Sequence, residues 1–178
     1  MKWGKWIAAG ILAAFAAAVS AVTADESSLR PQLQVLDIAV GKWEYHGQNR
    51  ATPDQKAEAW TWSEDCNWSA NRAFLACSFT MRSPGKVVKS LAVSTYNFDD
   101  HGYWHYEMFD SDGKGAEPFI SRMTVAGNTW TEYGHADKKT YRIVYQYTSS
   151  TQVSLRIELS ADKIHWTTVA QGEGIKQG

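Results

Sequence analysis

The sequence has 178 residues and a formal net charge of −1, and 44% of its residues are hydrophobic and 13% aromatic. This length allows one domain with a hydrophobic core of ordinary size. The nearly balanced charge and the lack of a basic run argue against nucleic acid as a partner. The high aromatic content is more typical of strands than of helices.

The first residues have the pattern of a secretory signal peptide. Two lysines lie within the first five residues, and an apolar, alanine-rich run follows from Ile7 to Val19. The segment Val22-Thr23-Ala24 then has small residues at its end. These are the charged region, apolar region and cleavage site of a signal peptide, whereas a membrane-spanning helix needs about 20 apolar residues. We predict a signal peptide over residues 1–24 and a periplasmic or extracellular domain over residues 25–178 that is not inserted in a membrane. An uncleaved N-terminal anchor is the alternative.

A helical period follows the predicted signal. Apolar residues recur at intervals of three and four between Leu29 and Val40, which is the period of one helical face. Ser28 can cap this helix, Pro31 suits its first turn and Gly41 ends it. We expect a short amphipathic helix that packs against a sheet through Leu33, Leu36 and Val40.

After Gly41 the chain consists of short alternating segments separated by turn residues. The predicted strands are 43–48, 57–69, 73–82, 87–98, 103–110, 116–125, 129–134, 140–148, 152–160 and 165–172. A strand and turn at roughly every ten to twelve residues is typical of an all-β sandwich or barrel. Short connections favour pairing in chain order, and closure removes exposed sheet edges. We therefore predict an all-β fold, an antiparallel up-and-down barrel of about ten strands with one short N-terminal helix at one end.

Both cysteines lie in one predicted hairpin, which spans residues 60–81. A tight turn at Asn71-Arg72 places Cys66 directly opposite Cys77. Side chains of directly opposed residues on antiparallel strands are close enough to interact, and an even number of cysteines in an exported protein can pair internally. We predict a disulfide between Cys66 and Cys77, with two buried reduced thiols as the alternative.

The same alignment can be continued across the next two turns. With Met81 opposite Val87 and Phe98 opposite Tyr103, one mostly apolar face emerges. It contains Trp62, Cys66, Trp68, Leu75, Cys77, Phe79, Met81, Val87, Leu91, Val93, Trp104, Tyr106 and Met108. Binary patterning predicts that this face points into the barrel and that the reverse face, with His105 and Glu107, points outward. A shift of one residue would exchange the two faces.

Five short motifs lie at turns and strand starts. They are Val-Gly-Lys-Trp-Glu at 40–44, Asn-Arg-Ala-Phe-Leu at 71–75, Tyr-Asn-Phe-Asp at 96–99 with Gly-Tyr-Trp at 102–104, Phe-Asp-Ser-Asp-Gly at 109–113, and Ser-Ala-Asp at 160–162 with Trp166. Together they resemble the secreted, lipocalin-like proteins of domain-of-unknown-function family 1579. Asn71 and Ala73 depart from that family's glycine pattern, and its glycine after Asp162 is absent. The resemblance spans most of residues 33–177 and implies a calycin-type, lipocalin-like barrel but no catalytic residues.

Two charged residues, Glu64 and Lys89, lie on the predicted inward face, and both flank Phe79. A mostly apolar cavity with a few converging polar groups is the usual form of a small-molecule site. We therefore predict ligand contacts in the barrel lumen from Trp62, Glu64, Lys89, Trp104 and Tyr106. A wet rim that holds both charges is the alternative, because charged residues are seldom buried.

His105 and Glu107 lie two residues apart on one predicted strand and share a face. Such a pair can act as general acid and base, but an exposed polar strand has the same pattern, and we predict no catalytic residue. No histidine has a zinc-like spacing with cysteine, so we predict no metal site. His165 is the one histidine near the late strand from which some ten-stranded barrels bind haem. An isolated histidine lacks the partners of a metal ligand, so no cofactor is predicted.

The sequence has no nucleophile-elbow, phosphate-loop or dinucleotide motif. We expect an exported binding protein that holds a small apolar ligand in its lumen. One alternative is a hydrolase-like or isomerase-like enzyme that uses His105 and Glu107. Another is a structural or partner-binding envelope protein with a filled barrel. The lumen distinguishes these hypotheses, because a lumen packed solid excludes a ligand. Nothing in the sequence indicates an oligomeric state.

Overall fold

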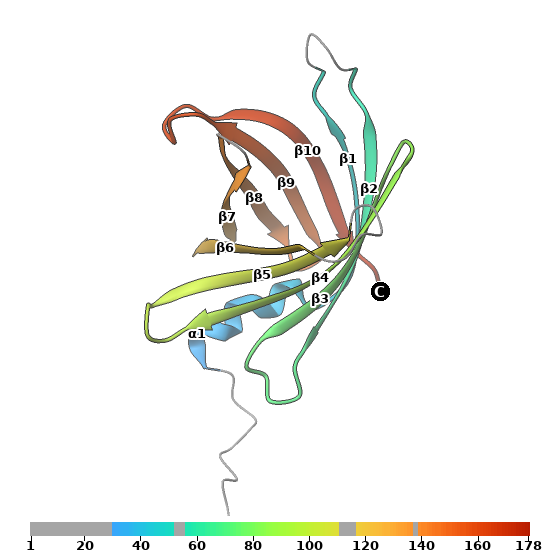
Figure 1. Ribbon diagram of the computed structural model, residues 1–178. Coiled ribbons are helices and arrows are strands. Elements are labelled where there is room, and N and C mark those ends of the chain that lie inside the picture. The colour runs from blue at the N-terminus through green and yellow to red at the C-terminus, as the bar shows by residue number, and fades with distance from the viewer. Residues whose placement is uncertain (1–29, 52–55, 111–116, 137–138) are drawn as a thin grey trace, which may run out of the picture.

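The ten strands of the described residues form one closed barrel (Figure 1). The computed structural model of the protein describes residues 30–51, 56–110, 117–136 and 139–178. Its elements are α1 (Pro31–Gln34), η1 (Val35–Ala39), β1 (Gly41–Asn49), β2 (Ala59–Trp68), β3 (Leu75–Ser83), β4 (Lys86–Asn97), β5 (Gly102–Asp110), β6 (Glu117–Ala126), β7 (Thr129–Ala136), β8 (Lys139–Ser149), β9 (Gln152–Ser160) and β10 (Thr167–Lys176). Each strand pairs antiparallel with its chain neighbours, and β10 pairs with β1. The predicted ten-stranded, antiparallel up-and-down barrel is confirmed.

The helical segment 31–39, here called the plug, closes one end of the barrel (Figure 1). Its buried residues, Leu33, Leu36 and Ala39, are three positions apart. A spacing of three matches the 3₁₀-helix, which has three residues per turn. This explains why α1 is only one turn long and η1 is a 3₁₀-helix, where an α-helical face was expected. Val40 packs against the same core, and Ser28 and Leu29 lie outside the described residues.

Side chains from four strands hold the plug in place. The bonds run from Trp43 Nε1 to Ala39 O (2.9 Å), Trp68 Nε1 to Asp37 Oδ1 (2.7 Å), Tyr103 Oη to Gln32 O (2.8 Å) and Lys176 Nζ to Ile38 O (3.2 Å). The donors come from β1, β2, β5 and β10 and satisfy plug carbonyls and the carboxylate of Asp37. The plug therefore forms a fixed floor, and we call the opposite end of the barrel the mouth.

Cys66 and Cys77 are directly opposed in the ladder of β2 and β3, and a disulfide joins them. The predicted disulfide and the register of this hairpin are confirmed. The connecting turn is wider than expected, because strand pairing ends at Trp68 and Leu75. Arg72 takes a positive φ of 51° in this turn.

The register between β3 and β4 differs from the prediction by one residue. Met81 pairs with Val88 rather than Val87, because the turn has only two central residues, Pro84 and Gly85, and Gly85 takes a φ of 73°. The β4–β5 register differs by two residues, since Tyr103 pairs with Tyr96, and a shift of two preserves the faces.

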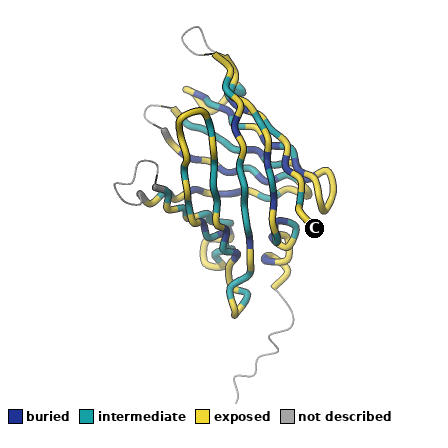
Figure 2. Tube along the Cα trace, turned by 90° about the vertical axis from the view of Figure 1, so that its right-hand side faces the viewer, coloured by how far each residue is buried: buried dark blue, intermediate teal, exposed yellow. Residues whose placement is uncertain are grey.

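The shift of one residue exchanges the two faces of β4 and β5. The predicted inward orientation is therefore wrong for Val87, Leu91, Val93, Trp104, Tyr106 and Met108. With Ile120 of β6, four of these form an exposed surface, here called the outer apolar patch: Val87, Leu91, Tyr106, Met108 and Ile120. Figure 2 shows the alternation of buried and exposed residues along the barrel wall.

Candidate functional site

A small cavity lies inside the barrel against the plug. Its volume is about 40 Å³, which is room for a few water-sized groups, whereas a small-molecule pocket usually has about 300–1,000 Å³. Its lining combines Ala39 of the plug, five aromatic residues and three ionisable ones: Tyr45, Phe79, Trp130, Tyr145, Tyr147, Glu64, His105 and Glu132. The floor of the lumen thus accepts only a small chemical group.

Nearer the mouth, inward side chains are reached by solvent. Trp62 stacks on the buried Tyr45 with ring centroids 5.0 Å apart, and Ile143 is paired with Ile157 on the lumen face. Trp62, Ile143 and Ile157 are only partly buried, and so are Phe119 and Tyr141, whose rings stack 5.7 Å apart. The described part of the lumen is therefore a cup with an apolar and aromatic wall that solvent partly reaches and a floor closed by the plug.

Glu64 projects from β2 into this cup. Burial raises the pKa of its carboxyl to about 7, against the opposing effects of a hydrogen bond with Tyr45 and of the charge on His105. Glu64 therefore keeps its proton to a higher pH than an ordinary glutamate does. Its Oε1 atom lies 2.7 Å from Cys66 Sγ, but a disulfide sulfur carries no proton, so this contact is not a hydrogen bond.

His105 lies at the centre of a polar chain across β4 and β5. Its Nδ1 atom is 2.9 Å from Ser94 Oγ, and its Nε2 atom is 3.8 Å from Glu107 Oε2. Burial lowers the pKa of His105, but the carboxylates of Glu132, Glu107 and Glu64 outweigh burial and raise it. For Glu107, burial raises the pKa, and hydrogen bonds from His105 and Ser90 outweigh this and lower it.

Glu132 completes the group from β7, across the lumen from Glu64 of β2 and two strands away from His105 of β5. Its side chain is 4% exposed, and it accepts a hydrogen bond of 2.8 Å from Ser121 Oγ. Burial raises the pKa of Tyr145, and the Glu132 carboxylate raises it further. We call Glu64, His105, Glu107 and Glu132 the lumen cluster. The pKa values of Glu64, His105 and Glu107 are shifted, and perturbed ionisable groups that converge in a concave site are typical of functional sites.

The residues predicted from the sequence divide between the two faces. Trp62 and Glu64 point into the lumen, whereas Lys89, Trp104 and Tyr106 lie on the outer surface, and Tyr106 belongs to the outer apolar patch. The ring of Trp104 instead lies under Arg122, 4.7 Å from its guanidinium carbon. These three residues therefore make no contact with the lumen, because of the one-residue register shift.

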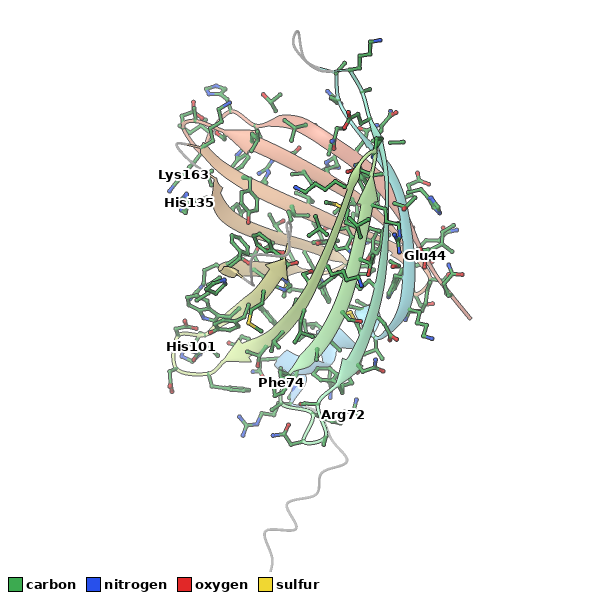
Figure 3. All side chains as sticks on the ribbon, turned by 45° about the vertical axis from the view of Figure 1, so that its right-hand side comes forward. Glu44, Arg72, Phe74, His101, His135 and Lys163 are labelled. Atoms are coloured by element: carbon green, nitrogen blue, oxygen red, sulfur yellow. A yellow bond between two sulfur atoms is a disulfide. The ribbon has the colours of Figure 1, made fainter. Side chains whose placement is uncertain are left out.

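His105 and Glu107, which were expected to point outward, are inside the barrel. The other histidines lie outside it: His46, His101, His135 and His165 are exposed, and Figure 3 shows His101 and His135 projecting from the surface. His165 is bonded to Asp162 at 2.7 Å. Glu132 was not predicted as a site residue, although it lies two residues after Trp130 on a predicted strand and so shares the face of Trp130.

One set of potential metal donors is excluded by the disulfide. Atoms of Glu64, Cys66 and Cys77 lie close enough to share an ion, but both sulfurs are bonded to each other. A cysteine ligates metal as a thiolate, so this set cannot hold an ion while the disulfide is intact.

The closed ten-stranded barrel, with a plug at one end and a partly solvent-exposed lumen wall, defines a lipocalin-like protein. The family model described as "Protein of unknown function (DUF1579)" matches residues 29–174. The chain belongs to this family, as the sequence motifs indicated. No curated protein matches the sequence.

Two solved structures have a similar fold. The S-type phycobiliprotein lyase CPES from Guillardia theta is 10% identical with a TM-score of 0.57, over 82% of this chain and 92% of that one. Rv2717c from M. tuberculosis is 14% identical with a TM-score of 0.54, over 85% of this chain and 100% of that one. At such identities the likeness is one of fold alone. Among the described residues, no helix has the length and apolar character to cross a membrane.

Proposed function

We propose that the protein binds a small molecule in the lumen, with a small polar group in the cavity at the floor and an apolar body along the upper wall. The observation that carries this proposal is the lumen cluster itself. Ionisable groups inside a barrel cost stability unless they are paired or hydrated, and packing alone does not require them. The partly exposed inner wall also argues against the alternative of a filled, purely structural barrel.

This proposal modifies the ligand expected from the sequence. A wholly apolar molecule suits the wall formed by Trp62, Phe119, Ile143 and Ile157, but not a floor that contains Glu64, His105 and Glu132. Most small-molecule sites are apolar with a few polar groups that fix orientation. We therefore propose an amphiphilic ligand rather than an apolar one.

The neutral apolar fluorophore N-phenyl-1-naphthylamine tests lumen binding. We expect a saturable rise in its emission with the wild type and loss of this signal in Ile157→Trp, because the added indole fills the upper lumen. Ile175→Trp is the matched control, since Ile175 is on the outer surface and 52% exposed. Circular dichroism verifies that both variants fold. Equal binding by both variants would contradict the proposal, and so would a failure of both this fluorophore and amphiphilic probes to bind the wild type.

A second candidate is acid–base or nucleophilic catalysis at Ser94, His105 and Glu107. It is favoured by the 2.9 Å contact between Ser94 Oγ and His105 Nδ1, because a serine is activated by an adjacent base. Glu107, on the far side of the ring, stabilises the imidazolium that would form. Hydrolysis of p-nitrophenyl acetate tests this candidate. We expect the wild type to exceed Ser94→Ala and His105→Ala by at least tenfold, and equal rates would exclude it.

We also propose that the protein is exported and that residues 1–24 are removed. The signal-peptide pattern supports this proposal, and so does a disulfide, because disulfides persist in oxidising compartments. Intact-mass measurement on protein from the periplasmic or extracellular fraction of its host is expected to show a chain that begins at Asp25. A full-length chain retained with the membranes would contradict it.

A further inference from the structure

The lumen cluster has an excess of acidic groups. Three carboxyl groups, of Glu64, Glu107 and Glu132, share the space around a single imidazole, that of His105. One imidazole can offset the charge of only one carboxylate, so acidic groups outnumber basic ones in this cluster. An enclosed charge is stable only when a counter-charge or hydrogen bonds compensate it, so the floor of the lumen favours a positively charged partner.

The cavity wall is also suited to a cation. Five of the lining residues are aromatic: Tyr45, Phe79, Trp130, Tyr145 and Tyr147. The faces of aromatic rings attract cations, and aromatic cages are a recurrent way of binding ammonium groups. The aromatic rings and the carboxylates of this cavity therefore both favour a cation.

Basic side chains that could bind an anion are absent from the described part of this cavity, apart from His105. Lys89 is on the outer surface. Lys176 faces inward at the floor, but it donates to Ile38 O and lies 5.1 Å from the ring of Trp43. His105 is itself surrounded by carboxylates, so a ligand carboxylate or phosphate would meet repulsion.

We infer that the ligand carries a small cationic nitrogen, such as a primary ammonium group, which enters the floor cavity between Glu132 and Glu64. This inference rests on the proposed function and specifies the chemistry of its ligand. The cavity of about 40 Å³ admits a head group of a few atoms and no more. The apolar body of an alkyl or aryl amine then lies against the wall toward the mouth.

Three octyl compounds with different head groups test this inference. Titration calorimetry and tryptophan fluorescence of the wild type at pH 7 compare octylamine, 1-octanol and octanoate. We expect octylamine to bind at least tenfold more tightly than the other two. Glu132→Gln, which preserves the size of the side chain and its bond with Ser121, is expected to weaken octylamine at least tenfold. Glu44→Gln removes a carboxylate from the outer surface (Figure 3) and is expected to change nothing.

The outcomes separate this inference from the proposed function. Equal or tighter binding of octanol or octanoate overturns the cationic ligand but leaves lumen binding standing. Unchanged octylamine affinity in a folded Glu132→Gln variant has the same meaning. If Glu132→Gln does not fold, the comparison of the three compounds on the wild type still shows whether a cationic head group is preferred. Binding of none of the probes, including N-phenyl-1-naphthylamine, overturns both.

Discussion

The carboxyl group of Glu64 is expected to make the stability of the protein depend on pH. Its pKa is raised from the ordinary 4.5 to about 7 in the folded chain. Below pH 4.5 the group is protonated in both states and contributes no pH dependence. Between pH 4.5 and 7 the unfolded chain loses the proton first, so the free energy of unfolding falls as the pH rises. Above pH 7 the cost stays constant at about 3 kcal/mol, since each unit of pKa shift corresponds to about 1.4 kcal/mol.

Glu64→Gln replaces this group by a neutral amide of the same shape that still accepts a hydrogen bond from Tyr45. We expect the variant to match the wild type at pH 4.5 and to exceed it by about 3 kcal/mol at pH 8. Urea denaturation at both pH values, followed by fluorescence and circular dichroism, measures the difference. Glu44→Gln, on the outer surface, is the control. An equal effect of Glu64→Gln at the two pH values would refute the raised pKa of the Glu64 carboxyl in the folded chain.

Three further predictions concern the stability of the barrel, each measured by urea denaturation. Replacing Cys66 and Cys77 together by alanine is expected to lower the free energy of unfolding by about 3 kcal/mol. The disulfide joins residues 11 positions apart, and without it the unfolded chain gains conformational freedom. A loss below about 1 kcal/mol would contradict this. Leu36→Ala in the plug is expected to cost about 2–5 kcal/mol, as the side chain is 0% exposed, and an unchanged midpoint would show that the plug is not packed. Leu91→Ser on the outer apolar patch is expected to change stability by less than about 0.5 kcal/mol, whereas Leu75→Ser, at 1% exposed, costs more than about 2 kcal/mol. Similar losses in these two variants would contradict the register between β3 and β4.

The strands, the barrel and the disulfide follow from local signals in the sequence. Turn residues and alternation define the ten strands, and the pairing of β2 with β3 aligns Cys66 with Cys77. The register of β4 could not be obtained in the same way. A turn of two central residues and a turn of three are both compatible with Ser83-Pro84-Gly85-Lys86, and the choice determines which face of β4 points inward.

Binary patterning then favoured the wrong choice for a physical reason. On β4 and β5 the lumen face carries Ser94, His105 and Glu107, while the outer face carries Leu91 and Met108. The assumption that apolar side chains point inward fails where the interior is itself a polar site. The hypothesis about His105 and Glu107 was available from the sequence, but their position inside the barrel was not. Glu132 and Ser94 join them only through pairings between strands that no local pattern specifies.

The plug, which is the first described element of the fold, is bonded to β10, which is the last. Ile38 accepts a bond from Lys176, and Lys42 O accepts one of 2.8 Å from the backbone of Gln177, next to the seam where β10 closes on β1. A chain emerging from the ribosome or a translocation pore has therefore made nine strands before its acidic interior can be enclosed. Until β10 pairs with β1, the curved sheet remains open to water. Pairing between strands so far apart in the sequence is intrinsically slow. Damage to the tenth strand would consequently remove one of the side-chain bonds that hold the plug and leave β1 and β9 without their shared partner.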